Sequence, residues 1–222
     1  NLYIKNKKKF FLFYQVYIKQ VSYLLNLIGI NINTVPVLDV RRKKSHSVIS
    51  DRSYSYNHKI VSTIGNECIK RYHENKICTV IKHIPGHGLG KVDSHKRLPV
   101  VNKTSKYLNK RDFYTFRNKK SLFAMTAHIV FSKIDSKNCV THSSKMIKII
   151  RKTIGFKNLI ISDDISMKSL KYSIAINTRK TFKAGCNLVL HCNGIIREMK
   201  EVAKNSPKID KFIIKKTSEF KY

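Results

Sequence analysis

The stretch KHIPGHGLGKVDSH, residues Lys82–His95, follows an apolar run that ends at Ile81. Its glycines and its proline predict a loop that leaves a strand, because both residue types interrupt regular structure. Three histidines and one aspartate lie in this loop, and Asp93 stands two residues before His95. A carboxylate at that spacing can orient and polarise an imidazole, as a general acid/base histidine requires. The spacing alone leaves a metal site and a polar surface loop as alternatives.

Short apolar runs alternate with longer helical patterns on both sides of this loop. Each run is brief and continuously apolar, as expected of a parallel strand that is buried on both faces. The runs are Ile32–Val40, Ile77–Ile81, Leu122–Ala127, Leu159–Ile161 and Leu188–Leu190. The helical patterns cover His58–Glu74, Ser143–Ile154, Ser173–Ala184 and Ile195–Ala203. This alternation predicts an α/β fold with right-handed crossovers.

Polar residues stand at the carboxyl ends of these runs. They are Asp39, Lys82 and His83, Thr126–His128, Asp163 and Asp164, and His191. Such a gathering is typical of a (β/α)8 TIM barrel, whose chemistry lies at the C-terminal ends of its strands. An open doubly wound sheet is the alternative, but no run is followed by a GxGxxG or P-loop pattern. A complete barrel has eight strands, and about five are visible here. We therefore predict one partial domain over 1–222, an incomplete barrel whose first strands are missing.

Two adjacent aspartates, Asp163 and Asp164, end the fourth run. Carboxylates at the end of a buried strand are costly unless they are paired or functional. Successive strand side chains point in opposite directions, so only one of the two is expected to face the barrel axis. The alternative is an N-cap for a helix over Ile165–Leu170, and one aspartate can fill each role.

Earlier in the chain, Arg52 offers a planar guanidinium suited to hydroxyl or carboxylate recognition, with a surface ion pair as the alternative.

The composition of the chain bears on whether it binds nucleic acid or a membrane. The 222 residues carry a formal net charge of +32, which by itself suggests nucleic acid or an anionic membrane. The basic residues are scattered, however, as AT-rich coding would produce, so we expect no specific nucleic-acid partner. Polar residues interrupt the apolar N-terminal stretch, which predicts an amphipathic helix ending at Gly29 and no membrane span. Five cysteines without CxxC spacing predict reduced thiols in a cytoplasmic protein.

Seven stretches together resemble the bacterial glycoside hydrolase family 3 β-N-acetylhexosaminidases, which act in cell-wall recycling. In chain order they are PVLDV, DRSYS, KHIPGHG-x4-DSH, LPVV, AMTAHIVF, GFKNLIISDDISMKSL and AGCNLVLHCNG, and they span about Gly29 to Met199. The pattern KHxPGHG-x4-DSH is highly specific to that family, and the downstream SDD with its methionine reinforces it. The resemblance implies a retaining glycosidase on a single (β/α)8 barrel.

The resemblance also implies roles for single residues. Asp163 is expected to be the nucleophile of a covalent glycosyl-enzyme intermediate. His95, assisted by Asp93, is expected to act as general acid and then as general base, in place of the second carboxylate that glycosidases ordinarily use. Lys82 and His83 are expected to bind the sugar hydroxyls or the N-acetyl group, and Arg52 to make another sugar contact. No metal and no organic cofactor is implied.

The implied substrate is a non-reducing terminal β-linked N-acetylglucosamine carried on a 1,6-anhydromuropeptide, and we expect a monomer. A DQEGGRV-type segment that the family carries on earlier strands has no counterpart here, so we expect an N-terminally truncated chain. Two alternatives to an active enzyme follow. The chain could be a catalytically inactive remnant, or a basic nucleic-acid-binding protein on a relic scaffold, which steeply salt-dependent binding would reveal.

Overall fold

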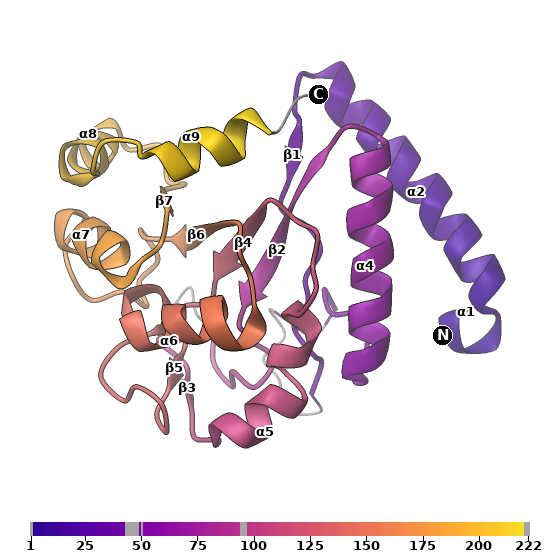
Figure 1. The fold of residues 1–222 in the computed structure, drawn as a ribbon, viewed down its shortest axis with the longest axis horizontal. Helices are drawn as coiled ribbons and strands as arrows, with labels where there is room; N and C mark the ends of the chain where they lie inside the picture. The colour runs from indigo at the N-terminus through magenta and orange to yellow at the C-terminus, as the bar shows by residue number, and fades with distance from the viewer. Residues whose placement is uncertain (1, 43–48, 50, 94–96, 220–222) are drawn as a thin grey trace.

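Five parallel strands form one curled sheet in the computed structural model, which describes residues 2–42, 49, 51–93 and 97–219. The strands lie side by side in the order in which they occur in the chain. They are β1 (Ile32–Asn33), β2 (Cys78–Ile84), β4 (Phe123–Thr126), β6 (Leu159–Asp164) and β7 (Leu188–Leu190). Every pairing is parallel. The sheet and its helices make an incomplete α/β barrel (Figure 1), which confirms the predicted fold class.

Two helices precede the first strand, and others lie between the strands as the crossovers of a parallel sheet require. They are α1 (Leu2–Lys5), α2 (Lys7–Leu27), α4 (His58–Glu74), α5 (Ser105–Lys110), α6 (Ser144–Ile149), α7 (Ile174–Ala184), α8 (Ile196–Asn205) and α9 (Lys211–Ser218). A π-helical turn over Ile150–Ile154 continues α6 to the left-handed Gly155. Short 3-10 turns cover Phe113–Phe116 and Val140–His142, and β3 (Val100–Val101) pairs with β5 (Val130–Phe131) in a small second sheet.

Local sequence explains where these helices begin and end. The Asn57 side chain accepts a hydrogen bond from the Lys59 amide at the start of α4, and Ser173 caps α7 in the same way. Side-chain oxygens at these positions satisfy amides that have no partner within the helix. Gly185 ends α7 with φ of 106°, a conformation that a side chain disfavours. The predicted helical boundaries in these two segments are confirmed to within one residue.

The two faces of the sheet bury different clusters. Ile81, Ala124 and Ile160 pack against the helices that cover the sheet, in a cluster that includes Val61 and Ile69 of α4. On the other face, Cys78, Val80, Phe123, Met125 and Leu159 form a cluster with Ile213 of α9. Helix α9 therefore crosses the concave face near the end at which the strands begin (Figure 1). The opposite end of that face, where the strands stop, carries the polar residues.

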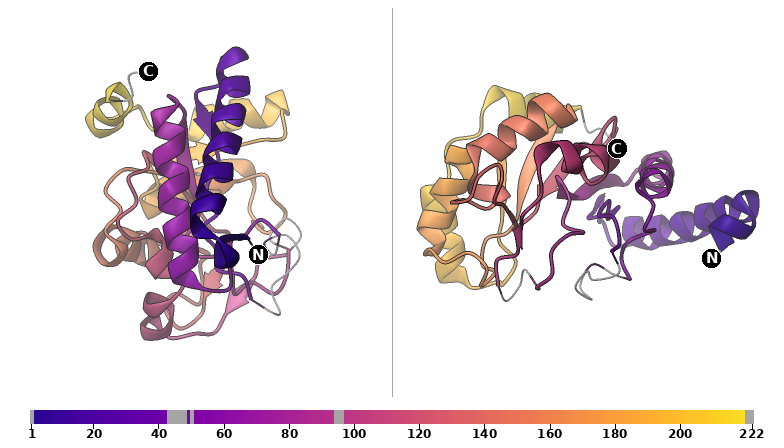
Figure 2. Two further views of the ribbon diagram at one scale, coloured as in Figure 1. Left: turned by 90° about the vertical axis from the view of Figure 1, so that its right-hand side faces the viewer. Right: turned by 90° about the horizontal axis from the view of Figure 1, so that it is seen from below.

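At the N-terminal side, α2 lies outside α4 and runs beside it, as Figure 2 shows. Ile18 of α2 is completely buried in a cluster with Cys68 and Tyr72 of α4. Burial of one isoleucine side chain contributes roughly 1.5–3 kcal/mol, so this seam holds the helix in place. Helix α2 ends just before Gly29, whose φ is 75°, as predicted. Among the helices that the structure describes, none is long and apolar enough to cross a membrane.

Two predicted elements are wrong in their extent. The run Ile32–Val40 forms a strand only at Ile32–Asn33, and beyond it a single bridge joins Val37 to Lys82. Pro36 lacks an amide hydrogen and therefore cannot continue the ladder. The predicted helix over Ile165–Leu170 is a series of turns, and the next helix starts only at Ile174.

Candidate active site

The polar residues that end the strands converge at one edge of the sheet, as parallel strands require. Because side chains alternate along a strand, Lys82 of β2 lies on the concave face with Val80, and Asp163 of β6 lies on it with Leu159. Ile160 faces the covering helices instead. The prediction that only one of the two adjacent aspartates faces the barrel axis is thus met by Asp163.

Asp39 is the anchor of the loop that follows β2. It is completely buried, and its carboxylate accepts hydrogen bonds from His83 Nδ1 at 2.6 Å and from the His87 amide at 2.6 Å. Burial raises the pKa of the Asp39 carboxyl, but the neighbouring His83 and His87 outweigh this effect and hold the pKa below its ordinary value. Because a carboxylate only accepts, the proton of the His83 ring sits on Nδ1. This leaves Nε2 to meet a ligand.

Asp163 sits within a small group of cationic and imidazole side chains. Burial raises the pKa of its carboxyl, but His83, His128 and Lys82 act in the opposite direction. The Asp164 amide also donates to Asp163 Oδ1 at 2.8 Å. The net pKa lies below the ordinary value of an aspartate. The carboxylate is therefore ionised at neutral pH and has the charge that a nucleophile needs.

Asp164 has a structural role in the turns beside the site. Its Oδ1 accepts hydrogen bonds from the Ser166 amide at 3.0 Å and from the Cys192 amide at 3.2 Å, and the Ser166 hydroxyl donates to Oδ2 at 2.7 Å. Asp164 therefore ties the turn after β6 to the turn after β7. The predicted capping role is met in a turn, and not at a helix, because nine residues of turns and loop separate Asp164 from α7, which starts at Ile174.

His128 is held in the site by hydrogen bonds at both ring nitrogens. Its Nε2 donates to the Asp164 carbonyl at 3.0 Å, since a carbonyl only accepts. Its Nδ1 therefore accepts from the Thr141 hydroxyl at 2.8 Å, and Thr126 donates to Thr141 at 2.8 Å. Complete burial lowers the pKa of His128 despite the nearby Asp163. The imidazole is thus held in one orientation beside the Asp163 carboxylate, with Nε2–H on the Asp164 carbonyl.

Of the remaining predicted ligands, Lys82 lies near Asp163 and Arg52 lies near Lys82. Lys82 is half-buried and donates from Nζ to the Thr34 hydroxyl at 3.2 Å. Burial, followed by the nearby Arg52, lowers the pKa of Lys82, while Asp163 and Asp39 act to raise it. The structure therefore brings Lys82, Arg52 and His83 within electrostatic reach of one another or of Asp163. Arg52 itself is exposed.

The predicted acid/base pair is described in part. Asp93 is half-buried, whereas His95 lies outside the described residues. No group of three or more histidine, cysteine, aspartate or glutamate side chains is arranged to hold a metal ion in residues 2–42, 49, 51–93 and 97–219.

Close backbone approach explains the glycines of the loop. A Cβ on Gly88 would lie 2.1 Å from the Val40 carbonyl oxygen, and a Cβ on Gly86 would lie 3.0 Å from Asp112 Cβ. Gly86 also has φ of 133°, which side chains rarely adopt. Asp112 is buried and accepts hydrogen bonds from Arg42 at 3.0 and 2.9 Å. The loop therefore rests against a partly buried ion pair on one side and a backbone carbonyl on the other.

Asp39 and His128 belong to the candidate site, although local spacing does not assign them to it. Asp39 stands 44 residues before His83, and His128 contacts the carbonyl of a residue 36 positions later. The available signal is the place of each at the end of a predicted strand. His87 lies in the same loop and is also buried. Burial lowers its pKa to about 4, and neither ring nitrogen has a hydrogen-bond partner in the described part of the chain.

Comparisons with known proteins agree with this geometry. The family model for the glycosyl hydrolase family 3 N-terminal domain matches residues 13–216. A β-hexosaminidase from Neisseria meningitidis serogroup C is 32% identical over 184 residues, which are 80% of this chain and 51% of that protein. A β-hexosaminidase from Nitrosomonas eutropha is 30% identical over 185 residues, which are 79% of this chain and 53% of that protein.

Solved structures show the same likeness. The native NagZ structure from Neisseria gonorrhoeae matches with a TM-score of 0.82 and 28% identity, over 93% of this chain and 62% of that chain. The chain spans about half the length of the two curated relatives, 51% and 53%. With a family model that covers most of its residues, the chain belongs to glycosyl hydrolase family 3.

Proposed function

We propose that this chain carries the catalytic residues of a retaining β-N-acetylhexosaminidase. Its substrate would be a non-reducing terminal β-linked N-acetylglucosamine on a 1,6-anhydromuropeptide, as peptidoglycan recycling in the cytoplasm supplies. The observation that carries the proposal is the Asp163 carboxylate. It lies at the end of β6 on the concave face, and His83, His128 and Lys82 help hold its pKa below the ordinary value although burial opposes them. The similarity to β-hexosaminidases supports the same substrate class.

In the first step, an Asp163 carboxylate oxygen attacks the anomeric carbon and forms a covalent glycosyl ester. The bond between that carbon and the leaving oxygen breaks, and His95 gives its proton to the leaving oxygen. An ionised nucleophile is required, and its low pKa supports this role. A histidine acid has a pKa near neutrality and carries no negative charge that would oppose the ionisation of Asp163.

In the second step, water attacks the anomeric carbon and releases the Asp163 carboxylate. His95, now neutral, accepts a proton from that water, and Asp93 is proposed to orient its ring. Two displacements at one carbon retain the β configuration of the released N-acetylglucosamine. No cofactor takes part in either step.

The sugar is proposed to be held by three side chains. Nε2 of His83 can bond to a sugar hydroxyl because Asp39 occupies Nδ1. Lys82 lies near Asp163 and Arg52 lies near Lys82, so both can supply cationic donors to the sugar. Such contacts place the anomeric carbon against the nucleophile, and a misplacement of about 1 Å can cost roughly 100-fold in rate.

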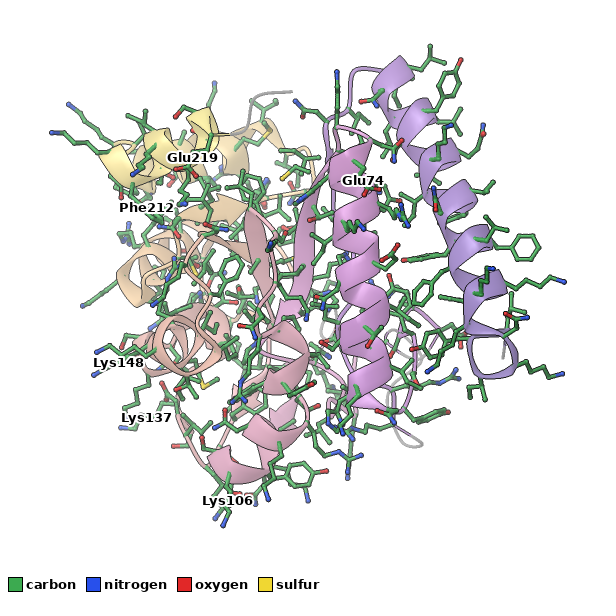
Figure 3. All side chains as sticks on the ribbon, turned by 45° about the vertical axis from the view of Figure 1, so that its right-hand side comes forward. Glu74, Lys106, Lys137, Lys148, Phe212 and Glu219 are labelled. Atoms are coloured by element: carbon green, nitrogen blue, oxygen red, sulfur yellow. The ribbon has the colours of Figure 1, made fainter. Side chains whose placement is uncertain are left out.

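The test is hydrolysis of a chromogenic N-acetyl-β-glucosaminide by wild type and by the Asp163→Asn variant. We expect turnover in wild type and a loss of at least about 1,000-fold in the variant, because the nucleophile is lost. Glu74→Gln is the matched control, since Glu74 lies at the far end of α4 (Figure 3), and it should retain full activity.

A fluorinated N-acetylglucosaminyl donor that slows the second step should add one sugar mass to Asp163. Wild-type turnover no greater than that of Asp163→Asn, measured on folded protein, would identify an inactive chain. Turnover with inversion of configuration would exclude the covalent mechanism. DNA or RNA binding that weakens steeply with salt would favour the basic binding protein instead.

A further inference from the structure

Two hollows lie next to each other past the carboxyl ends of β6 and β7. The larger is about 570 Å3 and is lined by the turn after β6, by α7 and by the start of α8. The smaller is about 240 Å3 and is lined by the segment around 137–142 and by the turn that precedes α7. Leu170 and Tyr172 line both. We call the two hollows together the Tyr172 groove.

Three buried polar atoms that line the Tyr172 groove have no hydrogen-bond partner within the described residues. They are Asn177 Oδ1, His142 Nε2 and Ser169 Oγ. Asn177 is only 1% exposed and Ser169 only 3%. A buried polar atom without a partner costs about 1–3 kcal/mol, and such atoms are few in native proteins. Three of them along one groove indicate that a ligand completes their hydrogen bonds.

The Asn177 amide shows which kind of group the groove accepts. Its nitrogen donates to the Ile165 carbonyl at 3.3 Å and to the Tyr172 carbonyl at 3.1 Å. These two bonds fix the orientation of the amide, so Oδ1 remains as an acceptor for a ligand N–H or O–H. The Ser169 hydroxyl can donate as well as accept. A peptide backbone, with alternating N–H and C=O groups, matches this set.

The rim of the groove is basic. Four exposed cationic residues line it, namely Lys137, Lys168, Lys171 and Arg197. The acid that lines it, Glu198, already accepts hydrogen bonds from His191 Nε2 at 2.8 Å and from Asn193 Nδ2 at 2.6 Å. Exposed Tyr172 adds an aromatic surface between the two hollows. Charge complementarity therefore favours a ligand with carboxylate groups.

The groove adjoins the proposed catalytic centre on the side of its loops. Its lining starts at Ile165, two residues after Asp163 in the sequence. It also includes Leu98, three residues after His95 in the sequence. A group attached to the leaving oxygen, close to Asp163, can extend along the turn after β6 toward such a surface.

We propose that the Tyr172 groove binds an acidic peptide carried by the leaving group of the substrate. This inference rests on the proposed function for the identity of the sugar, but the groove is tested separately by binding. The peptide N–H groups meet Asn177 Oδ1 and Ser169 Oγ, and its carboxylates meet the rim lysines. Recognition of the leaving group thereby uses residues that take no part in bond cleavage.

The experiment measures equilibrium binding by calorimetry to two probes. One is N-acetylglucosaminyl-1,6-anhydro-N-acetylmuramoyl tripeptide, and the other is the same disaccharide without peptide. Asp163→Asn protein is used so that neither probe is consumed. We expect the peptide to tighten binding roughly tenfold, as one or two charge-assisted hydrogen bonds would.

Two substitutions in the same background test the groove itself. Lys171→Glu and Ser169→Ala should each remove at least about half of the peptide-dependent gain, measured as the ratio of the two dissociation constants. Ser169→Ala deletes a hydroxyl that has no partner, so its thermal unfolding should match that of the parent. Lys215→Glu on α9, at the opposite end of the sheet, is the control and should leave the ratio unchanged.

Equal affinity for the two probes would overturn the proposal, as would a ratio that neither groove substitution changes. Hydrolysis of the chromogenic substrate by wild type reports separately on the catalytic centre. A peptide-dependent ratio in a chain that does not hydrolyse that substrate would contradict the proposed activity and support the groove. Hydrolysis without any peptide preference would do the reverse.

Discussion

Replacement of Asp39 by asparagine tests whether one buried carboxylate organises the catalytic loop. The substitution keeps the shape of the side chain but removes its charge. An asparagine oxygen can still accept from the His87 amide, which lies 2.6 Å from Asp39 Oδ1. The asparagine nitrogen then faces His83 Nδ1, so the His83 ring proton must move to Nε2. The charged hydrogen bond of 2.6 Å between Asp39 and His83 becomes a neutral one.

The size of the effect follows from burial. Asp39 is 0% exposed, so solvent does not replace the lost interaction. Hydrogen bonds to charged groups contribute about 1.5–3 kcal/mol, and we expect the free energy of unfolding at pH 7 to fall by that amount. For a chain of this size the melting temperature would fall by roughly 3–12 °C. The exposed Asp51, which is 89% exposed and pairs with Arg41 at 3.4 Å, gives the matched Asp51→Asn control with little change.

The pH dependence gives the sharper result. The pKa of Asp39 is lower in the folded state than in the unfolded chain, so its stabilisation is complete above the unfolded pKa of about 3.9. It is lost as the pH falls through the folded pKa. Urea unfolding of both proteins at pH 7, 5, 4 and 3 should therefore show a difference that is constant at the higher values and shrinks below about pH 4. Equal stability at pH 7, or a difference that grows on acidification, would refute the assignment.

Three further substitutions test buried contacts, the first two beside the site and the third before the start of β4. Gly88→Ala should lower the urea midpoint more than Gly194→Ala, because the Cβ added to Gly88 would lie 2.1 Å from a carbonyl oxygen, while Gly194, with φ of 72°, adds backbone strain but its Cβ meets nothing within 4 Å. Thr141→Val should cost about 1–3 kcal/mol by leaving the buried Nδ1 of His128 without its donor, and nitrogen NMR should show a shifted Nδ1 signal while the ring proton stays on Nε2. Burial lowers the pKa of Lys119 to about 8, so the unfolded state binds more protons between about pH 8 and 10.5 and stability rises over that window. Lys119→Met should lose this rise, and an unchanged pH profile would show that the amine is not desolvated.

Periodic patterns were enough to predict much of the fold. The five parallel strands and the boundaries of α4 and α7 follow from apolar runs and capping residues, which are local signals. The short pair β3 and β5 has only two residues in each strand, too few for any periodicity to appear. Helix α9 packs through Ile213 onto the concave face, and this contact joins residues far apart in the chain. Tertiary packing, and not local propensity, determines such elements.

The site was predictable to the extent that it depends on strand ends. Asp163, Lys82 and His83 are brought to one edge because parallel strands end there. The pairing of Asp39 with His83 could not be predicted, since it depends on how the segment after Pro36 leaves the sheet. The sequence pattern instead pairs Asp93 with His95, which remains a prediction because His95 lies outside the described residues.

The charge of the chain acts at two different ranges, and the two have different consequences. The net charge of +32 resides mainly on exposed lysines, whose fields are screened within about 8 Å at physiological salt. The groups that lower the pKa of Asp163 are instead His83, His128 and Lys82, which are buried or half-buried beside it. Screening by salt is weak there, so the low pKa of Asp163 depends on these neighbours and on the Asp164 amide, and not on the overall excess of lysine. The exposed rim of the Tyr172 groove is the place where the basic composition can influence substrate choice, because an acidic peptide meets those cations directly.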